Sequence, residues 1–224
     1  SPLPYRAFGY DEIGSAFRLM QNAGHIGKIV IQPPVQGRDR VVARSKDALR
    51  FNSDGMFLVA GGIGGFGLVA ADWLVARGAR NIALCSRRGV ADEATVKAME
   101  KWARSGVSAS VHASDITDET SLNGLLAELR SKAPIKGIIH AAMVLDDALL
   151  SNLTTERNRP VVDVKVRGAE LLDKLTADDD LEFFLLFSSA TTMLGNPGQA
   201  NYVMANGFLE GLARRRRAAG KPGL

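Results

Sequence analysis

Three side chains in the second half of the sequence could together reduce a ketone with a hydride donor: Lys165, Ser189 and Tyr202. A tyrosine can protonate the alkoxide as it forms if a nearby cation, such as a lysine, stabilises the phenolate. A serine hydroxyl can hold the carbonyl oxygen by a hydrogen bond during the transfer. Taken singly, each residue is more often structural, and a tyrosine in a helix usually packs. Their combination behind a nucleotide-binding turn favours the catalytic interpretation.

The candidate nucleotide-binding turn lies between a strand and a helix. The apolar residues 56–60 predict a buried strand, and a helical pattern follows from Leu68. Between them, Gly62, Gly64 and Gly67 have the G-x-G-x-x-G spacing. In such a turn the first glycine permits a tight turn, the second lets the backbone approach a pyrophosphate, and the third lets helix and strand pack closely. A purely structural glycine turn is the alternative, but the position at a helix start favours a dinucleotide site.

The end of the second predicted strand indicates which dinucleotide is bound. In NAD-binding folds an acidic residue at this point holds the ribose 2′-hydroxyl. Here the strand 81–86 ends in Ser86-Arg87-Arg88, without an acid. A carboxylate would repel a 2′-phosphate, whereas arginine can donate paired hydrogen bonds to it and serine can donate one. The sequence therefore favours NADPH over NADH. The alternative is that both arginines are merely solvated.

Strands and helices alternate from Gly55 onward. We expect strands at 56–60, 81–86, 108–112, 136–141 and 182–188, and helices after the glycines and at 91–105, 118–132, 162–176 and 200–219. This alternation is typical of an α/β fold of the Rossmann type, a doubly wound parallel sheet covered on both faces. Ligands of such sheets lie at the carboxyl ends of the strands, where Ser189 follows the fifth strand. Asp115 follows the third strand and could accept from an adenine amino group, with a helix N-cap as the alternative.

Residues 1–35 form a unit of their own in the sequence pattern. Asp11 could cap a helix that has four apolar residues on one face, and Gly24 could end it; the four are Ile13, Ala16, Phe17 and Met20. A strand at 28–32 follows. One helix and one strand cannot bury a core, so this unit must pack on other protein. Residues 36–54 are polar and charged and are predicted to be a linker, with an option of a short strand at 41–42.

Composition excludes several other classes. The 224 residues are 46% hydrophobic and 23% charged, as in ordinary globular proteins. The basic run Arg214–Arg217 lacks interleaved aromatic residues, which favours a solvated helix face over a nucleic-acid patch. The single Cys85 excludes a disulfide within the chain and favours a reducing compartment. No signal peptide opens the chain and no apolar run approaches the ~20 residues of a membrane span. We therefore expect a cytoplasmic protein, or a piece of one, that binds no membrane, nucleic acid or metal.

Further motifs surround the candidate catalytic residues. They are Gly61-Gly62-Ile63-Gly64-Gly65-Phe66-Gly67, Ser86-Arg87-Arg88-Gly89, His140-Ala141-Ala142, Leu145-Asp146-Asp147, Phe187-Ser188-Ser189 and Pro197-Gly198-Gln199-Ala200-Asn201-Tyr202. Together they resemble the β-ketoacyl reductase domain of type I polyketide synthases and related fatty-acid synthases, over most of residues 55–224. The resemblance implies an extended short-chain dehydrogenase fold. It also implies reduction of a β-ketoacyl thioester on acyl carrier protein with NADPH.

The resemblance assigns roles by position. Tyr202 resembles the family's proton donor, and Ser189 its hydrogen-bond donor to the carbonyl. Lys165 resembles the lysine that supports tyrosine and ribose, and Asn206 the relay asparagine. Single-domain short-chain dehydrogenases usually have lysine where this chain has Asn206, four residues after the tyrosine. The residues expected to contact the cofactor are Gly62, Gly64, Gly65, Gly67, Ser86, Arg87, Asp115, Ile116, Ala141, Lys165 and Tyr202.

The loop after the fourth strand bears on stereochemistry. Leu145, Asp146 and Asp147 resemble the Leu-Asp-Asp signature of B-type ketoreductases, which give the D-configured alcohol. This loop would guide the pantetheine arm into the groove from one side. The alternative is that the two aspartates cap the next helix. Met143 stands where bacterial relatives commonly have glycine, so the backbone near the nicotinamide is expected to differ.

The resemblance also covers the ends of the chain. The helix and strand in 1–35 are similar to the closing elements of the enoyl reductase domain, which directly precedes the catalytic half of the ketoreductase in fully reducing modules. In the family, the chain continues past Leu224 into a sixth strand, a lid helix and further sheet. We therefore expect a C-terminally truncated fragment that is inactive alone. Its parent is expected to be a homodimer with neighbouring enoyl reductase and dehydratase domains.

Two other functions are kept as alternatives. One is a catalytically silent module that binds NADPH or partners within such a synthase. The intact set of four residues, Lys165, Ser189, Tyr202 and Asn206, favours the enzyme over this module. The other is a different dinucleotide enzyme, such as an epimerase, for which lysine would be expected four residues after the tyrosine.

Overall fold

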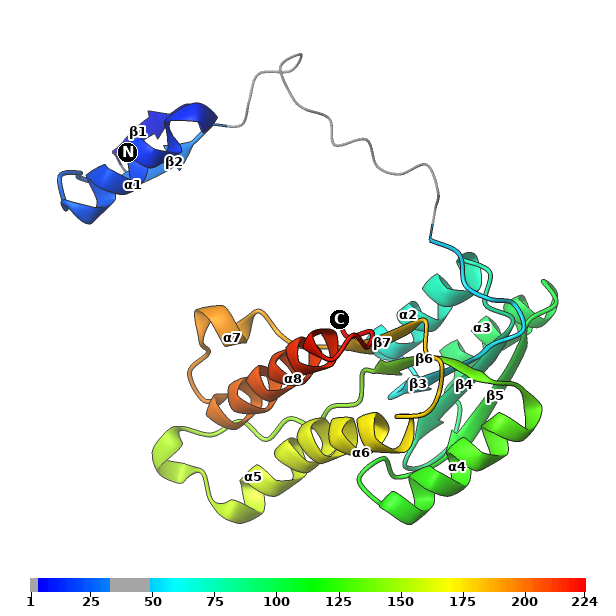
Figure 1. Cartoon of the computed structure of the whole chain (residues 1–224). Coiled ribbons are helices and arrows are strands. Elements are labelled where there is room, and N and C mark those ends of the chain that lie inside the picture. The colour runs from blue at the N-terminus through cyan, green and yellow to red at the C-terminus, as the bar shows by residue number, and fades with distance from the viewer. Residues whose placement is uncertain (1–3, 33–48) are drawn as a thin grey trace. The chain divides into compact units, whose positions relative to one another are not determined.

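The computed structural model describes residues 4–32 and 49–224, which divide into two compact units. The larger unit contains a five-stranded sheet in the order β5-β4-β3-β6-β7, with every neighbouring pair parallel. Its strands are β3 (Met56–Ala60), β4 (Asn81–Ser86), β5 (Ser108–Ala113), β6 (Ile135–His140) and β7 (Phe183–Leu186). The strand order reverses between β3 and β6 (Figure 1), and such a reversal opens a crevice at the carboxyl ends of the strands.

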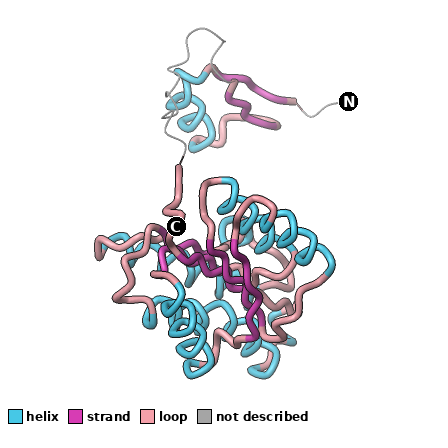
Figure 2. The backbone as a smooth tube through the Cα atoms, turned by 90° about the vertical axis from the view of Figure 1, so that its right-hand side faces the viewer, coloured by secondary structure: helices cyan, strands magenta, loops and turns pink. Residues whose placement is uncertain are grey.

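Helices cover both faces of this sheet, and Figure 2 shows the strands between the helical layers. The helical elements are α2 (Gly65–Ala76), α3 (Glu93–Ala103), α4 (Glu119–Lys132), the 3₁₀ turn η2 (Leu150–Asn152), α5 (Thr155–Val162), the π-helical segment η3 (Asp163–Arg167), α6 (Gly168–Leu175), α7 (Thr191–Leu194) and α8 (Ala200–Ala218). Leu74 of α2 and Trp102 of α3 belong to the core on one face. Leu126 of α4 and Leu209 of α8 belong to the core on the other. The predicted doubly wound Rossmann-type fold is confirmed.

The central strand β3 is apolar at every position because both of its faces are buried. Its five residues are all buried. Met56, Leu58 and Ala60 pack into the core under α4 and α8, while Phe57 and Val59 pack into the core under α2 and α3. Since successive side chains of a strand point to opposite faces, a strand covered on both sides must be apolar at every position.

The predicted helical residues 162–176 belong to a longer helical stretch before β7, as the sequence pattern indicated. Helical structure begins at Thr155, where the Thr154 hydroxyl accepts a hydrogen bond from the backbone N–H of Arg157. It continues without a break through η3 to Leu175. Pro160 lies inside α5. Because proline usually disfavours a helix interior, the sequence gives no clear signal of where this stretch begins before residue 162.

The smaller unit contains a strand that the sequence analysis missed. It consists of β1 (Tyr5–Phe8), the 3₁₀ turn η1 (Tyr10–Glu12), α1 (Ile13–Gln21) and β2 (Lys28–Ile31), with β1 and β2 parallel. Two predicted helix signals are wrong. The side chain of Asp11 does not cap α1, because η1 precedes the helix and the Glu12 carboxylate accepts from the N–H of Gly9. The residue with positive φ at the helix end is Ala23 rather than Gly24.

The apolar face predicted for α1 is only partly buried within this small unit. Ala16 is buried, whereas Phe17 and Met20 are 64% and 50% exposed. A helix and two strands of this length thus leave large apolar side chains uncovered, as expected for a unit with so little core.

The predicted linker 36–54 lies mostly outside the described residues, and so does the option of a strand at 41–42. Phe51, at its end, is buried. The Phe51 ring lies 5.5 Å from that of Phe57, 5.2 Å from that of Trp73 and 5.1 Å from that of Phe183, between ring centroids. This aromatic contact places Phe51 in the core of the larger unit, ahead of residue 55.

The basic run at the end of α8 is not a simple solvated face. Arg216 is 3% exposed, forms an ion pair with Asp173, and donates from Nε to the Pro222 carbonyl at 2.6 Å. Its guanidinium also stacks 4.0 Å from the ring centroid of Phe184. A buried arginine of this kind serves the fold rather than a nucleic-acid partner.

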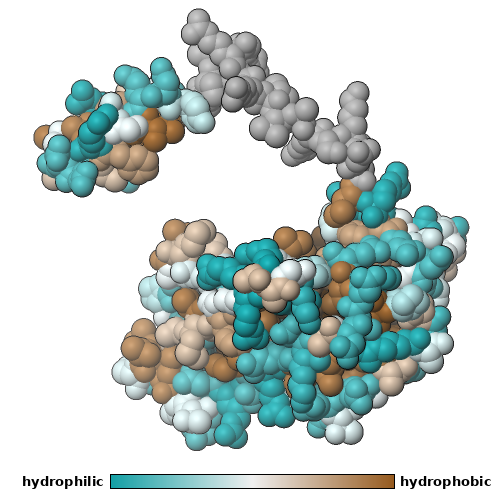
Figure 3. All heavy atoms as spheres, in the orientation of Figure 1, coloured by the Kyte–Doolittle hydropathy of each residue, from teal (hydrophilic) through white to brown (hydrophobic). Residues whose placement is uncertain are grey.

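The outer surface of the larger unit mixes polar and apolar residues on the face drawn in Figure 3. Among residues 4–32 and 49–224, we find no helix long and apolar enough to cross a membrane.

Candidate active site

The glycine turn between β3 and α2 is shaped by close backbone contacts. A Cβ on Gly67 would lie 2.0 Å from the Gly61 carbonyl oxygen, so only glycine lets α2 start against the turn. Gly64, the N-cap of α2, has φ +76°, a conformation that glycine adopts without strain. A Cβ on Gly65 would meet nothing within 4 Å, so the backbone is open on this side. The turn therefore presents an accessible helix N-terminus.

A cavity of about 1080 Å³ lies in front of this turn, at the carboxyl edge of the sheet. Its wall contains most of the residues predicted to contact a cofactor: Gly64, Gly65, Gly67, Ser86, Arg87, Asp115, Ile116, Ala141, Lys165 and Tyr202, together with the predicted catalytic Ser189. Gly62 instead packs beneath the turn, where a Cβ would lie 2.7 Å from the Val59 carbonyl oxygen. Asn206 and the loop 145–147 are not part of the cavity wall.

The wall also contains apolar side chains, among them Ile63, Phe66, Val144, Val164 and Phe187, to which the sequence assigned no role, and Met143, which was expected near the nicotinamide. The rings of Phe66 and Phe187 lie 6.3 Å apart between centroids. Each of these residues is close in sequence to a predicted site residue, but the sequence does not show that its side chain faces the cavity. Cys85 also borders the cavity, and burial raises the pKa of its thiol to about 12. The thiol is therefore neutral and unreactive at physiological pH.

Lys165 lies in the π-helical segment η3 and is almost fully buried. Its Nζ donates a hydrogen bond to the Phe187 carbonyl at 2.9 Å and lies 5.3 Å from the centroid of the Tyr202 ring. Burial lowers the pKa of Lys165 to about 8, so most of the amine is still protonated at neutral pH. Single π turns within helices are common at functional sites. The structure therefore holds a cation beside Tyr202.

His140 supports the same segment, a contact that the sequence did not reveal. Its Nε2 lies 3.3 Å from the backbone carbonyl oxygen of Lys165. Burial and the charge of Lys165 lower the pKa of His140 to about 4, so the ring is neutral at physiological pH. Among the residues that the structure describes, no partner binds its buried Nδ1. The neutral ring can therefore donate from Nε2 to the carbonyl of Lys165.

Ser189 follows β7, and its hydroxyl oxygen accepts two hydrogen bonds from one residue. The backbone N–H of Thr191 donates to Ser189 Oγ at 3.2 Å, and the Thr191 hydroxyl donates at 3.0 Å. Both contacts use lone pairs of the Ser189 oxygen. The proton of the Ser189 hydroxyl is thus left to donate into the cavity, as a hydrogen bond to a carbonyl oxygen requires.

Asn206 lies on α8, one turn after Tyr202, and is fully buried. Its Nδ2 donates to the Tyr202 carbonyl at 2.8 Å. Within the described part of the chain, its Oδ1 is buried without a hydrogen-bond partner. An unpaired buried amide oxygen is costly, and such groups are often explained by function or by an ordered water.

The predicted 2′-phosphate site lies at the end of β4. Arg87 and Arg88 are exposed and border the cavity, while Ser86 Oγ accepts from the N–H of Gly89 at 3.1 Å. Neither arginine has a side-chain hydrogen bond or ion pair to the residues described. Asp115 also borders the cavity, and its Oδ1 accepts from the N–H and hydroxyl of Thr117. The N-cap alternative for Asp115 is wrong, because Asp118 caps α4 through the N–H of Ser121.

The loop 145–147 is fastened to its surroundings by both aspartates. Asp146 pairs with Arg157, and Asp147 accepts from Gln199 Nε2 at 2.9 Å. The Asn201 amide donates to the Asp146 carbonyl at 3.1 Å. The alternative that these aspartates cap the next helix is wrong, because the side chain of Thr154 caps α5 and η2 has no side-chain cap. The loop is instead joined to the segment that leads into Tyr202.

The strand order, the glycine turn and the grouping of serine, tyrosine and lysine define a Rossmann-type reductase of the short-chain dehydrogenase class. A family model described as "KR domain" matches residues 55–224. The chain belongs to this family.

The chain is similar to curated polyketide synthases. It is 38% identical over 224 residues to "Highly reducing polyketide synthase 40" of Fusarium mangiferae, covering 100% of this chain and 9% of that protein. It is 41% identical over 212 residues to "Phenolphthiocerol synthesis polyketide synthase type I Pks15/1" of Mycobacterium bovis, covering 94% and 10%. The chain thus spans about a tenth of these relatives.

Solved structures of ketoreductases share the fold. "Structure of A-type Ketoreductases from Modular Polyketide Synthase" matches with a TM-score of 0.72 and 36% identity, covering 85% of this chain and 39% of that chain. "The first ketoreductase of the tylosin PKS" matches with a TM-score of 0.70 and 38% identity, covering 79% and 38%. The chain therefore spans about two fifths of these structures.

Proposed function

We propose that this chain carries the catalytic part of a ketoreductase, which uses NADPH to reduce a β-ketoacyl thioester on acyl carrier protein to the β-hydroxyacyl thioester. The single observation that carries the proposal is the buried amine of Lys165 beside the Tyr202 ring, in one cavity with Ser189 and the glycine turn. The chain acts as one domain of a polyketide or fatty-acid synthase. Residues 1–35 are the end of an enoyl reductase domain, and the synthase is a cytoplasmic homodimer with a dehydratase domain nearby.

The cavity fits NADPH on several counts. It is large enough for a dinucleotide and reaches from the open backbone at Gly65 to Tyr202. The N-terminus of α2 offers N–H groups to a pyrophosphate. At the end of β4, Arg87 is exposed and Ser86 replaces the acidic residue that would hold a 2′-hydroxyl. When bound, NADPH supplies the hydride.

The protein's own residues then position the ketone and move one proton. Ser189, whose oxygen accepts two hydrogen bonds from Thr191, donates a hydrogen bond from its hydroxyl to the carbonyl oxygen and keeps its proton. Tyr202 gives its phenolic proton to the same oxygen as negative charge develops there. The cation of Lys165 stabilises the phenolate that remains. Asn206, whose buried Oδ1 has no partner among the described residues, is proposed to hold a water of the path that returns a proton to Tyr202.

The loop 145–147 is proposed to set the stereochemistry. Asp146 and Asp147 fix it against Arg157 and Gln199, so Leu145, which is half exposed, projects from a rigid segment. The loop is proposed to guide the pantetheine arm into the groove from one side, which presents one face of the ketone to the hydride. The expected product is the D-configured 3-hydroxyacyl thioester. Chiral chromatography tests this, and an L-configured product would contradict it.

Two assays run side by side separate the enzyme from a catalytically silent NADPH-binding module. The protein that carries this chain is titrated with NADPH by fluorescence and assayed for NADPH consumption with a β-ketoacyl thioester or trans-1-decalone. The proposal expects both binding and turnover. Binding without turnover would show the silent module, and absence of binding would refute the cofactor assignment.

A further inference from the structure

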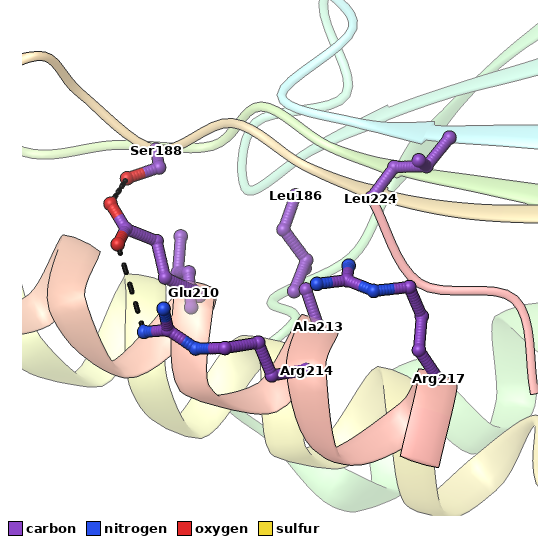
Figure 4. A pocket seen from close by; sticks show the side chains of 8 residues that line it. Leu186, Ser188, Glu210, Ala213, Arg214, Arg217 and Leu224 are labelled. Atoms are coloured by element: carbon purple, nitrogen blue, oxygen red, sulfur yellow. Dashed lines mark hydrogen bonds and ion pairs between the residues drawn. The ribbon is translucent and has the colours of Figure 1, made fainter. Parts of the chain in front are cut away.

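Ser188 and Thr192 lie on either side of Ser189, and both donate a hydrogen bond to one carboxylate on α8. Ser188 Oγ lies 2.9 Å and Thr192 Oγ1 lies 2.7 Å from Oε1 of Glu210. Figure 4 shows Ser188 and Arg214 at the two oxygens of this carboxylate. Hydrogen bonds to an ionised acceptor are stronger than those between neutral groups. Residues 188–192, which run from the loop after β7 into the first turn of α7, are therefore fastened to α8 on both sides of Ser189.

The same helix presents Tyr202. Tyr202, Asn206 and Glu210 follow one another at intervals of four residues in α8, so they share one face of the helix. The loop that carries Ser189 thus rests on the helix that carries Tyr202. Within that geometry, the separation between the serine and tyrosine hydroxyls depends on how the loop is held against the helix.

The Thr192 hydroxyl has two acceptors within reach and a single proton. Its oxygen lies 2.9 Å from the Ser189 carbonyl and 2.7 Å from Glu210. The Ser189 carbonyl already accepts from the backbone N–H of Thr192 at 3.1 Å. The carboxylate is the stronger acceptor, so the hydroxyl proton goes to Glu210. The hydrogen bonds from the Thr192 and Ser188 hydroxyls also hold the pKa of Glu210 below its ordinary value, which keeps the carboxylate ionised at neutral pH.

We propose that Glu210 is a positioning residue for ketone reduction, which clamps Ser188 and Thr192 and thereby fixes Ser189 at the distance from Tyr202 that the reaction needs. The inference rests on the proposed function, because it requires Ser189 to hold the substrate carbonyl. Glu210 is not part of the wall of the large cavity, so its proposed role runs through Ser189 and not through direct contact with the ketone. Its effect is orientation, and misplacing a catalytic group by about 1 Å can cost on the order of a hundredfold in rate.

A double-mutant cycle in the protein that carries this chain tests the clamp. The variants are Glu210→Ala, Glu210→Gln, Ser189→Ala and the double variant Ser189→Ala with Glu210→Ala. Glu100→Ala on α3 is the control, since the exposed side chain of this glutamate has no hydrogen bond or ion pair to the residues described. The measurements are kcat and KM with trans-1-decalone, and NADPH affinity by fluorescence titration.

Glu210→Ala should lower kcat by roughly tenfold to a hundredfold and leave NADPH affinity unchanged. Glu210→Gln should recover most of this loss, because its amide oxygen can still accept from both hydroxyls. In the Ser189→Ala background the Glu210→Ala loss should vanish, since the group being positioned is gone. Glu100→Ala should match the wild type.

Losses that simply add in the double variant, or a loss confined to NADPH affinity, would overturn the clamp and leave the proposed function standing. A Ser189→Ala variant with wild-type kcat would overturn both. If Glu210→Ala does not fold, Thr192→Val removes one donor with little change of shape and enters the same cycle. Its smaller loss should likewise vanish in the Ser189→Ala background, and persistence there would overturn the clamp.

Discussion

Nζ of Lys165 lies 5.3 Å from the centroid of the Tyr202 ring, and the two residues come from different helical elements. The amine is held there by its hydrogen bond to the Phe187 carbonyl at the end of β7. Burial of a lysine beside a tyrosine is unfavourable for the fold, because it desolvates the charge. A cation kept next to a phenol is useful in a reaction that leaves a phenolate behind.

The first prediction concerns the pH dependence of activity. Burial lowers the pKa of Lys165 to about 8, from an ordinary value of 10.5. The cation that we propose to stabilise the Tyr202 phenolate is therefore lost as pH rises through about 8. We expect kcat/KM for ketone reduction to fall with an inflection near pH 8. An alkaline limb only near pH 10.5 would show that Lys165 is not desolvated as the structure indicates.

The second prediction concerns stability and has the opposite sign. Between about pH 8 and 10.5 the unfolded chain still binds the Lys165 proton and the folded chain does not, so this group makes stability rise with pH. Across this pH range, the loss of the Lys165 charge raises the free energy of unfolding by on the order of 3 kcal/mol. The free energy of unfolding of the wild type minus that of Lys165→Met should therefore increase from pH 7 to pH 10. Urea denaturation at both pH values measures it, and a constant difference would contradict the prediction.

The third prediction concerns the cofactor. A charged hydrogen bond from Arg87 to a 2′-phosphate should contribute about 1.5–3 kcal/mol. Arg87→Ala should therefore weaken NADPH binding by about tenfold or more and leave NADH binding nearly unchanged. Arg104→Ala, at the exposed end of α3, is the control. Equal losses for NADPH and NADH in fluorescence titrations would remove Arg87 from the 2′-phosphate site.

The fourth prediction compares two neighbouring arginines. Arg216 is buried against Phe184 and pairs with Asp173, whereas Arg215 reaches the same aspartate from solvent at 3.5 Å. Removing one partner of a buried pair typically costs about 3–5 kcal/mol, and removing an exposed partner costs below about 1 kcal/mol. Arg216→Ala should therefore lower the denaturation midpoint far more than Arg215→Ala. Similar effects of the two substitutions would contradict the structural role of Arg216.

The sequence predicted the sheet well, because a strand covered on both faces needs an unbroken apolar run. The ranges of β3 and β4 are as predicted, and α8 ends one residue earlier than expected. The spacing of the glycines and of Ser189 and Tyr202 also located the residues that surround the cavity. Strands, glycine turns and short motifs each depend on residues close together in the chain, so they can be recognised from the sequence pattern.

The features that the sequence did not reveal depend on contacts between distant segments. The π turn around Lys165 is supported by His140 from another strand. The role proposed for Glu210 depends on its hydrogen bonds to Ser188 and Thr192, which lie about 20 residues earlier in the chain. In the sequence, Arg216 is one of four consecutive arginines predicted to be solvated, whereas in the structure it pairs with Asp173 and stacks on Phe184. Partners far apart in sequence leave no periodic signal.

The most direct test of the catalytic account is the Tyr202→Phe substitution in the protein that carries this chain. Phenylalanine keeps the ring packed beside Lys165 and removes only the hydroxyl that is proposed to donate the proton. Reduction of a β-ketoacyl thioester should be nearly abolished while the dissociation constant for NADPH stays close to that of the wild type. A Tyr202→Phe protein that reduces the thioester at the wild-type rate would contradict the account.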